Sequence, residues 1–404
     1  KEARKSRLMV RILYVFTGGR RSRFLAVRAG NEVPEEFLYG ATYLQSIGYD
    51  VDILELSDLS PDKTLPIYSE LTRRNTELQQ ATGFTSTSHF FVGALNTLNQ
   101  YDVIVAGSDS IAFGLSHFIA QDAIRPRVFG VLNALLFTQA IIRSEPLTAR
   151  VKDISRDLYY RFIFGRYRKR RQLYRQLLET TSGTIYGDRS GYEMARRMFP
   201  EFDKKIHLVA ACVDTEFWRP SLTAAQRDTA SGTILFMGND RGRDFELVLQ
   251  IARHLPHFRF VFVTDRIQPE QVSANVTLKQ GDWKRNLISD VEIRQIVQDS
   301  AIVIVPFKPG EVRTLTTVTM QAMACGKPAL VTKTSALWWP TFIDRQNVWF
   351  VHSGKLSEWC ESIERLMRDS VVRQRIRINA RRLVERQNNL TVLGSKLDAL
   401  IQQQ

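Results

Sequence analysis

One stretch, residues 301–332, constrains the fold more than any other part of the chain. Ala301–Val305 is a short apolar run that ends at a Pro/Gly loop, which predicts a buried strand. A helix over about 314–324 follows, because a Cys-Gly-Lys-Pro sequence after it is a typical helix stop. Ala329–Val331 is the next apolar run. Strand, helix and strand in this order predict an α/β fold with a parallel sheet.

The start of that helix is predicted to bind an anion. Ligands of open α/β sheets bind beyond the carboxyl ends of the strands, where helix N-termini offer free backbone N–H groups. A helix start stabilises an anion by about 0.3–1 kcal/mol, and Arg313 would add a full charge, so a phosphate fits there. The binding residues predicted at this junction are Val312, Thr314, Leu315, Thr316 and Thr317.

Residues 321–328, Gln-Ala-Met-Ala-Cys-Gly-Lys-Pro, precede an apolar strand and resemble the E-A-M-A-x-G-x-P motif of retaining GT-B glycosyltransferases of the family 4 type. The resemblance implies an α/β protein with two Rossmann-like domains whose parallel sheets face each other across a cleft. It also implies a hexosyl transfer, with retention, from a nucleotide-diphosphate sugar. The implied acceptor is a lipid or a membrane-associated glycan.

The chain departs from the family at its polar positions. The family places two glutamates eight residues apart, and here Arg313 and Gln321 stand at those positions. Gln321 would still bind a ribose hydroxyl, more weakly than a carboxylate does. Glu311 could take the place of the first glutamate, and Asn133 stands where many members have a histidine. The predicted catalytic residues are Arg243, Glu311 and Arg313.

A chain of 404 residues predicts about two domains. The octet Val213–Pro220 resembles the segment that joins the two domains of the family, and a polar hinge, 222–232, follows it. The predicted N-terminal, acceptor-binding domain is therefore 1–221, and the nucleotide-sugar-binding domain is 233–388. The resemblance implies that a last helix, 389–404, returns to the first domain.

Small polar loops follow the predicted strands of the first domain. Gly18 and Gly19 follow the first strand, where they either bring the backbone close to a substrate or only form a tight turn. An amphipathic helix is predicted over Pro34–Ile47. The loops after two later strands add Ser108, Asp109 and Asn133 to the predicted substrate-binding residues.

In the second domain the resemblance implies that Arg243, with Arg241, holds the donor diphosphate, because the planar guanidinium matches phosphate oxygens. Arg243 and Asp244 could instead pair with each other or cap the next helix. The other substrate-binding residues predicted at these strand ends are Gly238, Asn239, Thr264, Asp265 and Gln321.

The segment Arg150–Arg175 carries ten basic and two acidic residues, so it supplies +8 of the formal charge of +14. Aromatic residues recur in it at helical spacing, which is typical of a helix on an anionic membrane surface. Nucleic-acid binding and a solvated helix packed on its domain are the alternatives. The predicted membrane contacts are Phe162, Tyr167, Arg168, Lys169, Arg170 and Arg171.

Other features limit the function class. The sequence has no run of about 18 apolar residues and no signal-peptide pattern, which predicts a cytoplasmic protein. A peripheral position on the inner face of the plasma membrane is the further expectation. Three scattered cysteines predict reduced thiols without a zinc site. We expect no metal, no cofactor beyond the donor, and no nucleic-acid partner.

Two further function classes stay open on the sequence alone. The departures at Asn133, Arg313 and Gln321 are compatible with a non-catalytic GT-B-like module that binds a nucleotide or a partner. A nucleotide-sugar epimerase on the same fold is the third class.

Overall fold

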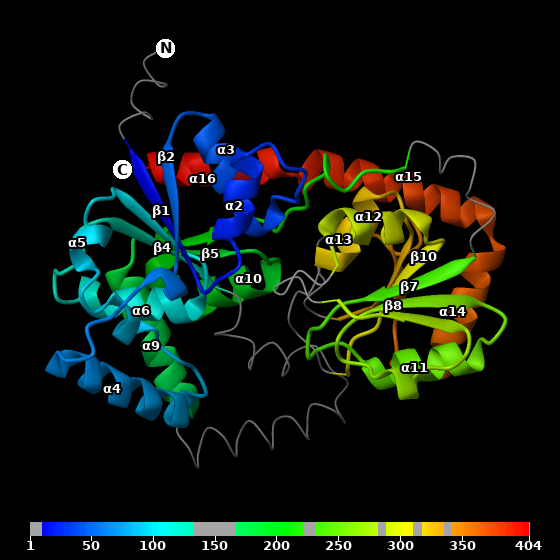
Figure 1. The fold of residues 1–404 in the computed structure, drawn as a ribbon, viewed down its shortest axis with the longest axis horizontal. Helices are drawn as coiled ribbons and strands as arrows, with labels where there is room; N and C mark the ends of the chain where they lie inside the picture. Colours follow the sequence, from blue (N-terminus) through cyan, green and yellow to red (C-terminus); the bar gives the residue numbers. More distant parts are fainter. Residues whose placement is uncertain are drawn as a thin grey trace. The chain divides into compact units, whose positions relative to one another are not determined.

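The computed structural model describes residues 10–132, 166–221, 232–281, 288–309, 317–334 and 341–403. The chain divides into two compact units (Figure 1). Unit 1 comprises residues 1–30, 37–210 and 394–404, and unit 2 comprises residues 31–36 and 211–393. The short segment 31–36 therefore belongs to unit 2, although the residues on both sides of it belong to unit 1.

Unit 1 is built on a six-stranded parallel sheet with the strand order β2-β1-β3-β4-β5-β6. The strands are β1 (Arg11–Phe16), β2 (Asp50–Glu55), β3 (Val103–Ala106), β4 (Arg127–Leu132), β5 (Gly183–Tyr186) and β6 (Ile206–Leu208). The α-helices are α2 (Arg21–Arg28), α3 (Ala41–Ser46), α4 (Pro66–Thr82), α5 (Leu95–Leu98), α6 (Asp109–Ile119), α9 (Arg166–Thr180) and α10 (Arg189–Met198).

Unit 2 has a second six-stranded parallel sheet with the order β12-β11-β10-β7-β8-β9. Its strands are β7 (Thr233–Met237), β8 (Arg259–Val263), β9 (Val276–Lys279), β10 (Ile302–Val305), β11 (Ala329–Thr332) and β12 (Trp349–Val351). Its helices are α11 (Phe245–His254), α12 (Asp290–Asp299), α13 (Thr317–Ala324), α14 (Leu356–Arg368) and α15 (Ser370–Gln387). The predicted α/β class with parallel sheets is confirmed.

Helices cover both faces of the unit 2 sheet, so its central strands β7, β10 and β11 are mostly apolar. Side chains alternate between the faces along a strand. Leu235 and Val303 accordingly pack in the core with α12, α13 and α15, whereas Ile234 and Ile302 pack with α11 and α14. Figure 1 shows α12 and α13 on one face and α11 and α14 on the other. The carboxyl ends of the strands and the loops after them form one edge, which we call the carboxyl edge.

The predicted helix over Pro34–Ile47 is wrong. The chain instead forms a 3₁₀ turn, Glu36–Leu38, and the short helix α3. Tyr39 and Gly40 separate them, with φ angles of 48° and 80° that are incompatible with a continuous right-handed helix. Tyr14 Oη–H donates a hydrogen bond to the carbonyl oxygen of Tyr39 at 3.1 Å, which holds the kink against β1.

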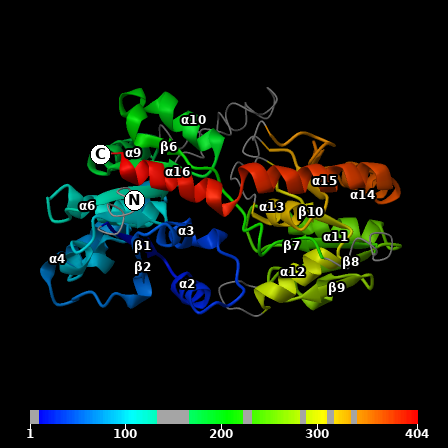
Figure 2. The same cartoon turned by 90° about the horizontal axis from the view of Figure 1, so that it is seen from above.

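The last helix, α16 (Leu390–Gln402), lies beside α3 in unit 1 over its second half (Figure 2). The hydroxyls of Tyr43 and Ser395 are 2.9 Å apart, and Tyr49 Oη–H donates to Asp398 Oδ1 at 2.7 Å. Gly394 is required here, because a Cβ at this position would lie 2.1 Å from the Tyr43 ring. The domain limits expected from the sequence remain predictions.

Candidate active site

Asn239, after β7, ties three segments of the carboxyl edge together. Its Nδ2–H donates to the carbonyl oxygen of Gly281 at 2.5 Å. Its Oδ1 accepts from Thr264 Oγ1–H at 2.7 Å and from the backbone N–H of Asp265 at 2.9 Å. The loop after β7 is thus bonded to the loops after β8 and β9. Three of the predicted substrate-binding residues, Asn239, Thr264 and Asp265, form one network.

Arg243 is buried where β7 and β10 end, with 1% of its surface exposed. Its guanidinium carbon lies 4.7 Å from the centroid of the Phe307 ring. A Cβ on Gly238 would approach Arg243 Nε to 3.2 Å, and Gly238 has a φ of 135°, so glycine gives this arginine its space. The residue after it, Asp244, accepts the N–H of Leu247 at 3.1 Å. Asp244 therefore caps α11, and Arg243 stacks on Phe307.

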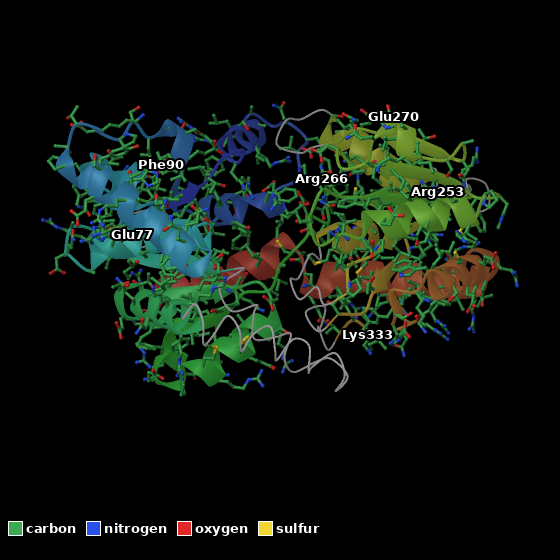
Figure 3. All side chains as sticks on the ribbon, turned by 90° about the horizontal axis from the view of Figure 1, so that it is seen from below. Glu77, Phe90, Arg253, Arg266, Glu270 and Lys333 are labelled. Carbon is green, nitrogen blue, oxygen red and sulfur yellow. The ribbon has the colours of Figure 1, made fainter. Side chains whose placement is uncertain are left out.

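Exposed basic side chains also lie in the loops of the same edge. They follow β7, β8, β10 and β11, and they are Arg241, Arg266, Lys308 and Lys333. Figure 3 labels Arg266 and Lys333. Asp265 lies 3.7 Å from Arg266 and offsets part of this charge. An edge lined mainly by cations raises the local concentration of an anionic ligand.

The predicted anion-binding junction lies largely outside the described residues. Of its members, Glu311, Val312, Arg313, Thr314, Leu315 and Thr316 are not described, whereas Thr317 is the first residue of α13. One turn further, Gln321 is 6% exposed, and its Nε2–H donates to Glu36 Oε1 at 2.9 Å. The structure thus pairs Gln321 with a carboxylate that the sequence analysis did not select.

The pKa values of the acids beside Gln321 are shifted upward. Burial, together with the nearby charge of Asp214, raises the pKa of Glu36 to about 7. Burial also raises the pKa of Asp214, although this carboxylate accepts the N–H groups of Phe217 and Glu35. Nothing in the local sequence identified Glu36, because its partner Gln321 is 285 residues away.

The predicted residues of unit 1 lie at the carboxyl end of its own sheet. Gly18 and Gly19 have φ angles of 156° and 77° and lead into α2. The start of α2 already has an anionic partner, because Glu55 Oε1 accepts the N–H groups of Arg20 at 2.5 Å and Arg21 at 2.8 Å. After β3, Ser108 bonds to Ser110 at 3.2 Å, and Asp109 is buried at the start of α6. Asn133 is outside the described part.

The predicted membrane residues fall on or before α9. Phe162 and the side chains of Tyr167 and Arg168 are outside the described part of the chain. Lys169 and Arg171 are exposed. Arg170 instead contacts its own unit, since its Nε–H donates to the carbonyl oxygen of Thr82 at 2.8 Å and its guanidinium lies over Phe84. Further along, Tyr174 is fully buried in the core.

The described residues contain neither a cluster of metal ligands nor a membrane-spanning helix. No three His, Cys, Asp or Glu side chains gather there as they would around a metal ion. None of the described helices combines the length and the apolar character needed to cross a membrane. The three cysteines are not in disulfides.

Comparison with known proteins agrees with this architecture. Residues 231–369 match the family described as "Glycosyl transferases group 1". The chain has the GT-B fold. The residues that match the family lie in unit 2, and they include Asn239 and Arg243 of the carboxyl edge. No curated protein matched in a direct sequence comparison.

The structural similarity extends over nearly the whole chain. HepE from Anabaena superposes with a TM-score of 0.60 at 13% identity, covering 97% of this chain and 99% of that chain. Sucrose-phosphate synthase from Thermosynechococcus elongatus gives a TM-score of 0.63 at 14% identity, with 98% of both chains covered. A glycosyltransferase from Rickettsia africae gives 0.59 at 13% identity, covering 98% and 99%. The predicted GT-B glycosyltransferase fold is confirmed.

Proposed function

We propose that this glycosyltransferase moves a hexose from a nucleotide-diphosphate sugar to an acceptor with retention of the anomeric configuration. HepE has been solved in complex with UDP and glucose and with UDP-glucose, which supports a nucleotide sugar as the donor. The proposed donor site is the carboxyl edge of unit 2. The proposed acceptor is a lipid or a membrane-associated glycan, bound mainly by unit 1.

One observation carries the proposal: a fully buried arginine among basic loops in the domain with the family match. When the bond between the sugar and the donor phosphate breaks, negative charge develops on the departing diphosphate. Positive groups that are already in place stabilise this charge without reorganising. Arg243 has a planar fork that suits phosphate oxygens, and its burial lowers the screening of its charge.

We propose that the reaction uses no metal cofactor, because basic side chains supply positive charge at this edge. We also propose a cytoplasmic protein that touches the inner face of the plasma membrane through the start of α9. The exposed Lys169 and Arg171 support this contact, since basic groups near an anionic surface each contribute about 1 kcal/mol.

Replacing Arg243 by methionine tests the donor site. Arg243→Met keeps much of the packing of the side chain on Phe307 but removes the charge. We expect a loss of about 10²-fold or more in transfer, measured as nucleoside diphosphate release from a panel of UDP-glucose, UDP-N-acetylglucosamine and GDP-mannose. The anomeric configuration of the product, read by NMR, tests retention.

The matched control is Arg253→Met, on an exposed arginine of α11 labelled in Figure 3. This control should transfer at the wild-type rate. A folded Arg243→Met protein with near-normal turnover would remove Arg243 from the site. Wild-type protein that binds the nucleotides without turnover would favour a binding module, and an isomerised donor would favour an epimerase.

A further inference from the structure

The buried carboxylate of Glu36 is shared by several groups of unit 2. Its Oε1 accepts a hydrogen bond from Trp218 Nε1–H at 2.8 Å and a second one from Gln321 Nε2–H at 2.9 Å. The backbone N–H of Asp214 lies 3.4 Å from its Oε2. Glu36 is 5% exposed. The donors that the described residues supply to this carboxylate are all neutral.

The surroundings of Glu36 hold it in one place. Trp218 is 1% exposed, and its ring meets Phe217 edge to face with the centroids 5.0 Å apart. Arg294 lies over Phe217 at 4.6 Å and donates to Glu32 Oε1 at 2.5 Å. The segment that carries Glu36 is thereby fixed to unit 2 at two carboxylates, Glu32 and Glu36.

This arrangement sets the orientation of the Gln321 amide. A carboxylate oxygen that already accepts the indole N–H can pair only with the NH₂ end of an amide. The carbonyl end, Gln321 Oε1, meets no hydrogen-bond donor among the residues that the structure describes. It is available to accept a hydrogen bond from a hydroxyl.

We propose that Glu36 is a positioning residue for Gln321: by accepting the Nε2–H, it presents Gln321 Oε1 as an acceptor to a hydroxyl group of the bound nucleotide. The inference rests on the proposed function, because it needs a nucleotide at the carboxyl edge. It gives a physical reason for glutamine at a position where the motif that residues 321–328 resemble has glutamate. The carboxylate of this site is supplied by the segment 31–36, and α13 supplies the amide that pairs with it.

A glutamate at 321 would conflict with this geometry. It would place two carboxylates about as close as the present amide and carboxylate, and two such groups cannot both ionise without a large cost. The titratable groups that interact with Glu36 are Asp214, which adds negative charge, and the buried thiols of Cys212 and Cys325. Two cations lie on the surrounding elements, but Arg294 pairs with Glu32, and Arg381 donates to the carbonyl oxygens of Thr215, Trp218 and Ala324.

A double-mutant cycle over Gln321→Glu and Glu36→Gln tests the inference. UDP affinity is measured by calorimetry, and the melting temperature is followed in parallel. At about pH 8 we expect Gln321→Glu alone to weaken UDP binding by about 10-fold or more, and by less than about 3-fold in the Glu36→Gln background. At about pH 5 one of the two carboxylates holds a proton, so the penalty of the single variant should shrink.

The matched control is Gln298→Glu, which alters another buried glutamine of unit 2, whose Nε2–H donates to the carbonyl oxygen of Arg219 at 2.6 Å. Its effect should not depend on residue 36. Gln321→Glu that binds UDP as well as wild type, or equally poorly in both backgrounds, would overturn the positioning role while wild-type UDP binding upholds the proposed function. A wild-type protein that binds neither UDP, GDP nor ADP would overturn both.

Discussion

Asn239 joins three loops with one side chain, through Gly281, Thr264 and Asp265. We expect Asn239→Ala to lower the free energy of unfolding by about 1–3 kcal/mol, because buried partners lose their hydrogen bonds. It should also weaken UDP binding, because the loops at the carboxyl edge lose their common tie. Chemical unfolding and calorimetry measure the two effects.

Asn275 provides the control for this variant. Its Nδ2–H groups bond to the carbonyl oxygens of Ala252, Leu255 and Phe258, at the other end of β9. Asn275→Ala should therefore destabilise unit 2 to a similar degree and leave UDP affinity unchanged. Equal losses of affinity in the two variants would mean that general destabilisation, and not the position of Asn239, explains the binding defect.

Glu36 makes stability depend on pH in a defined direction. Its pKa is about 7 in the folded chain, above the ordinary value of 4.5, so the native state keeps the proton longer than the unfolded state does. The stability tied to this proton is present below the ordinary pKa and is lost as pH rises to about 7. The shift corresponds to on the order of 3 kcal/mol. Glu36→Gln should flatten the fall in melting temperature over this range.

Glu32, in the same segment, changes the stability with pH in the opposite direction. Its hydrogen bond with Arg294 lowers its pKa, so its contribution is present above the ordinary pKa and is lost as pH falls. Glu32→Gln should therefore leave the decline between about pH 5 and 7 in place. If Glu36→Gln also leaves that decline unchanged, the carboxylate of Glu36 is not its source, and Asp214, whose pKa is raised too, becomes the candidate.

At the scale of the element, α9 has two different parts. Leu177 and Leu178 are fully buried, and Arg170 bonds to Thr82, so this helix is a packed component of unit 1. This part of the basic segment therefore matches the alternative of a solvated helix that packs on its own domain. Only Lys169 and Arg171, among the described side chains proposed for the membrane, are exposed.

Reversing these two charges tests the membrane contact. Lys169→Glu/Arg171→Glu should lower binding to phosphatidylserine vesicles by about 30-fold or more, because two favourable contributions of about 1 kcal/mol each are lost. Sedimentation with vesicles measures this. The control is Arg375→Glu/Arg382→Glu, which makes the same change in total charge at two exposed positions of α15. Vesicle binding that falls equally in both variants would show an effect of net charge alone.

At the scale of the whole molecule, the sequence predicted the strands of the segment 301–332 because each is a short apolar run next to turn residues. The strands predicted at Ala301–Val305 and Ala329–Val331 are observed, within one residue, as β10 and β11. These elements depend on local patterns of burial. The motif at 321–328 predicted a resemblance to GT-B glycosyltransferases, and the match to group 1 glycosyltransferases over 231–369 includes these residues.

The remaining features depend on contacts between distant residues. The helix predicted over Pro34–Ile47 satisfied the local pattern, but the bond from Tyr14 to Tyr39 favours a kink that no local rule contains. The basic residues of α9 suggested a surface helix, whereas Tyr174 is buried among residues from other segments. Glu36 was missed for the same reason, since its partners lie 182 and 285 residues away.

The segment 31–36 limits how the protein can be dissected. A fragment that begins at Ala211 would lack Glu32 and Glu36, and would leave the indole N–H of Trp218 and the amide of Gln321 without their acceptor. Chimeras that take the first 200 or so residues from a relative would introduce foreign side chains into unit 2. Such exchanges need to take residues 31–36 and α13 from the same protein.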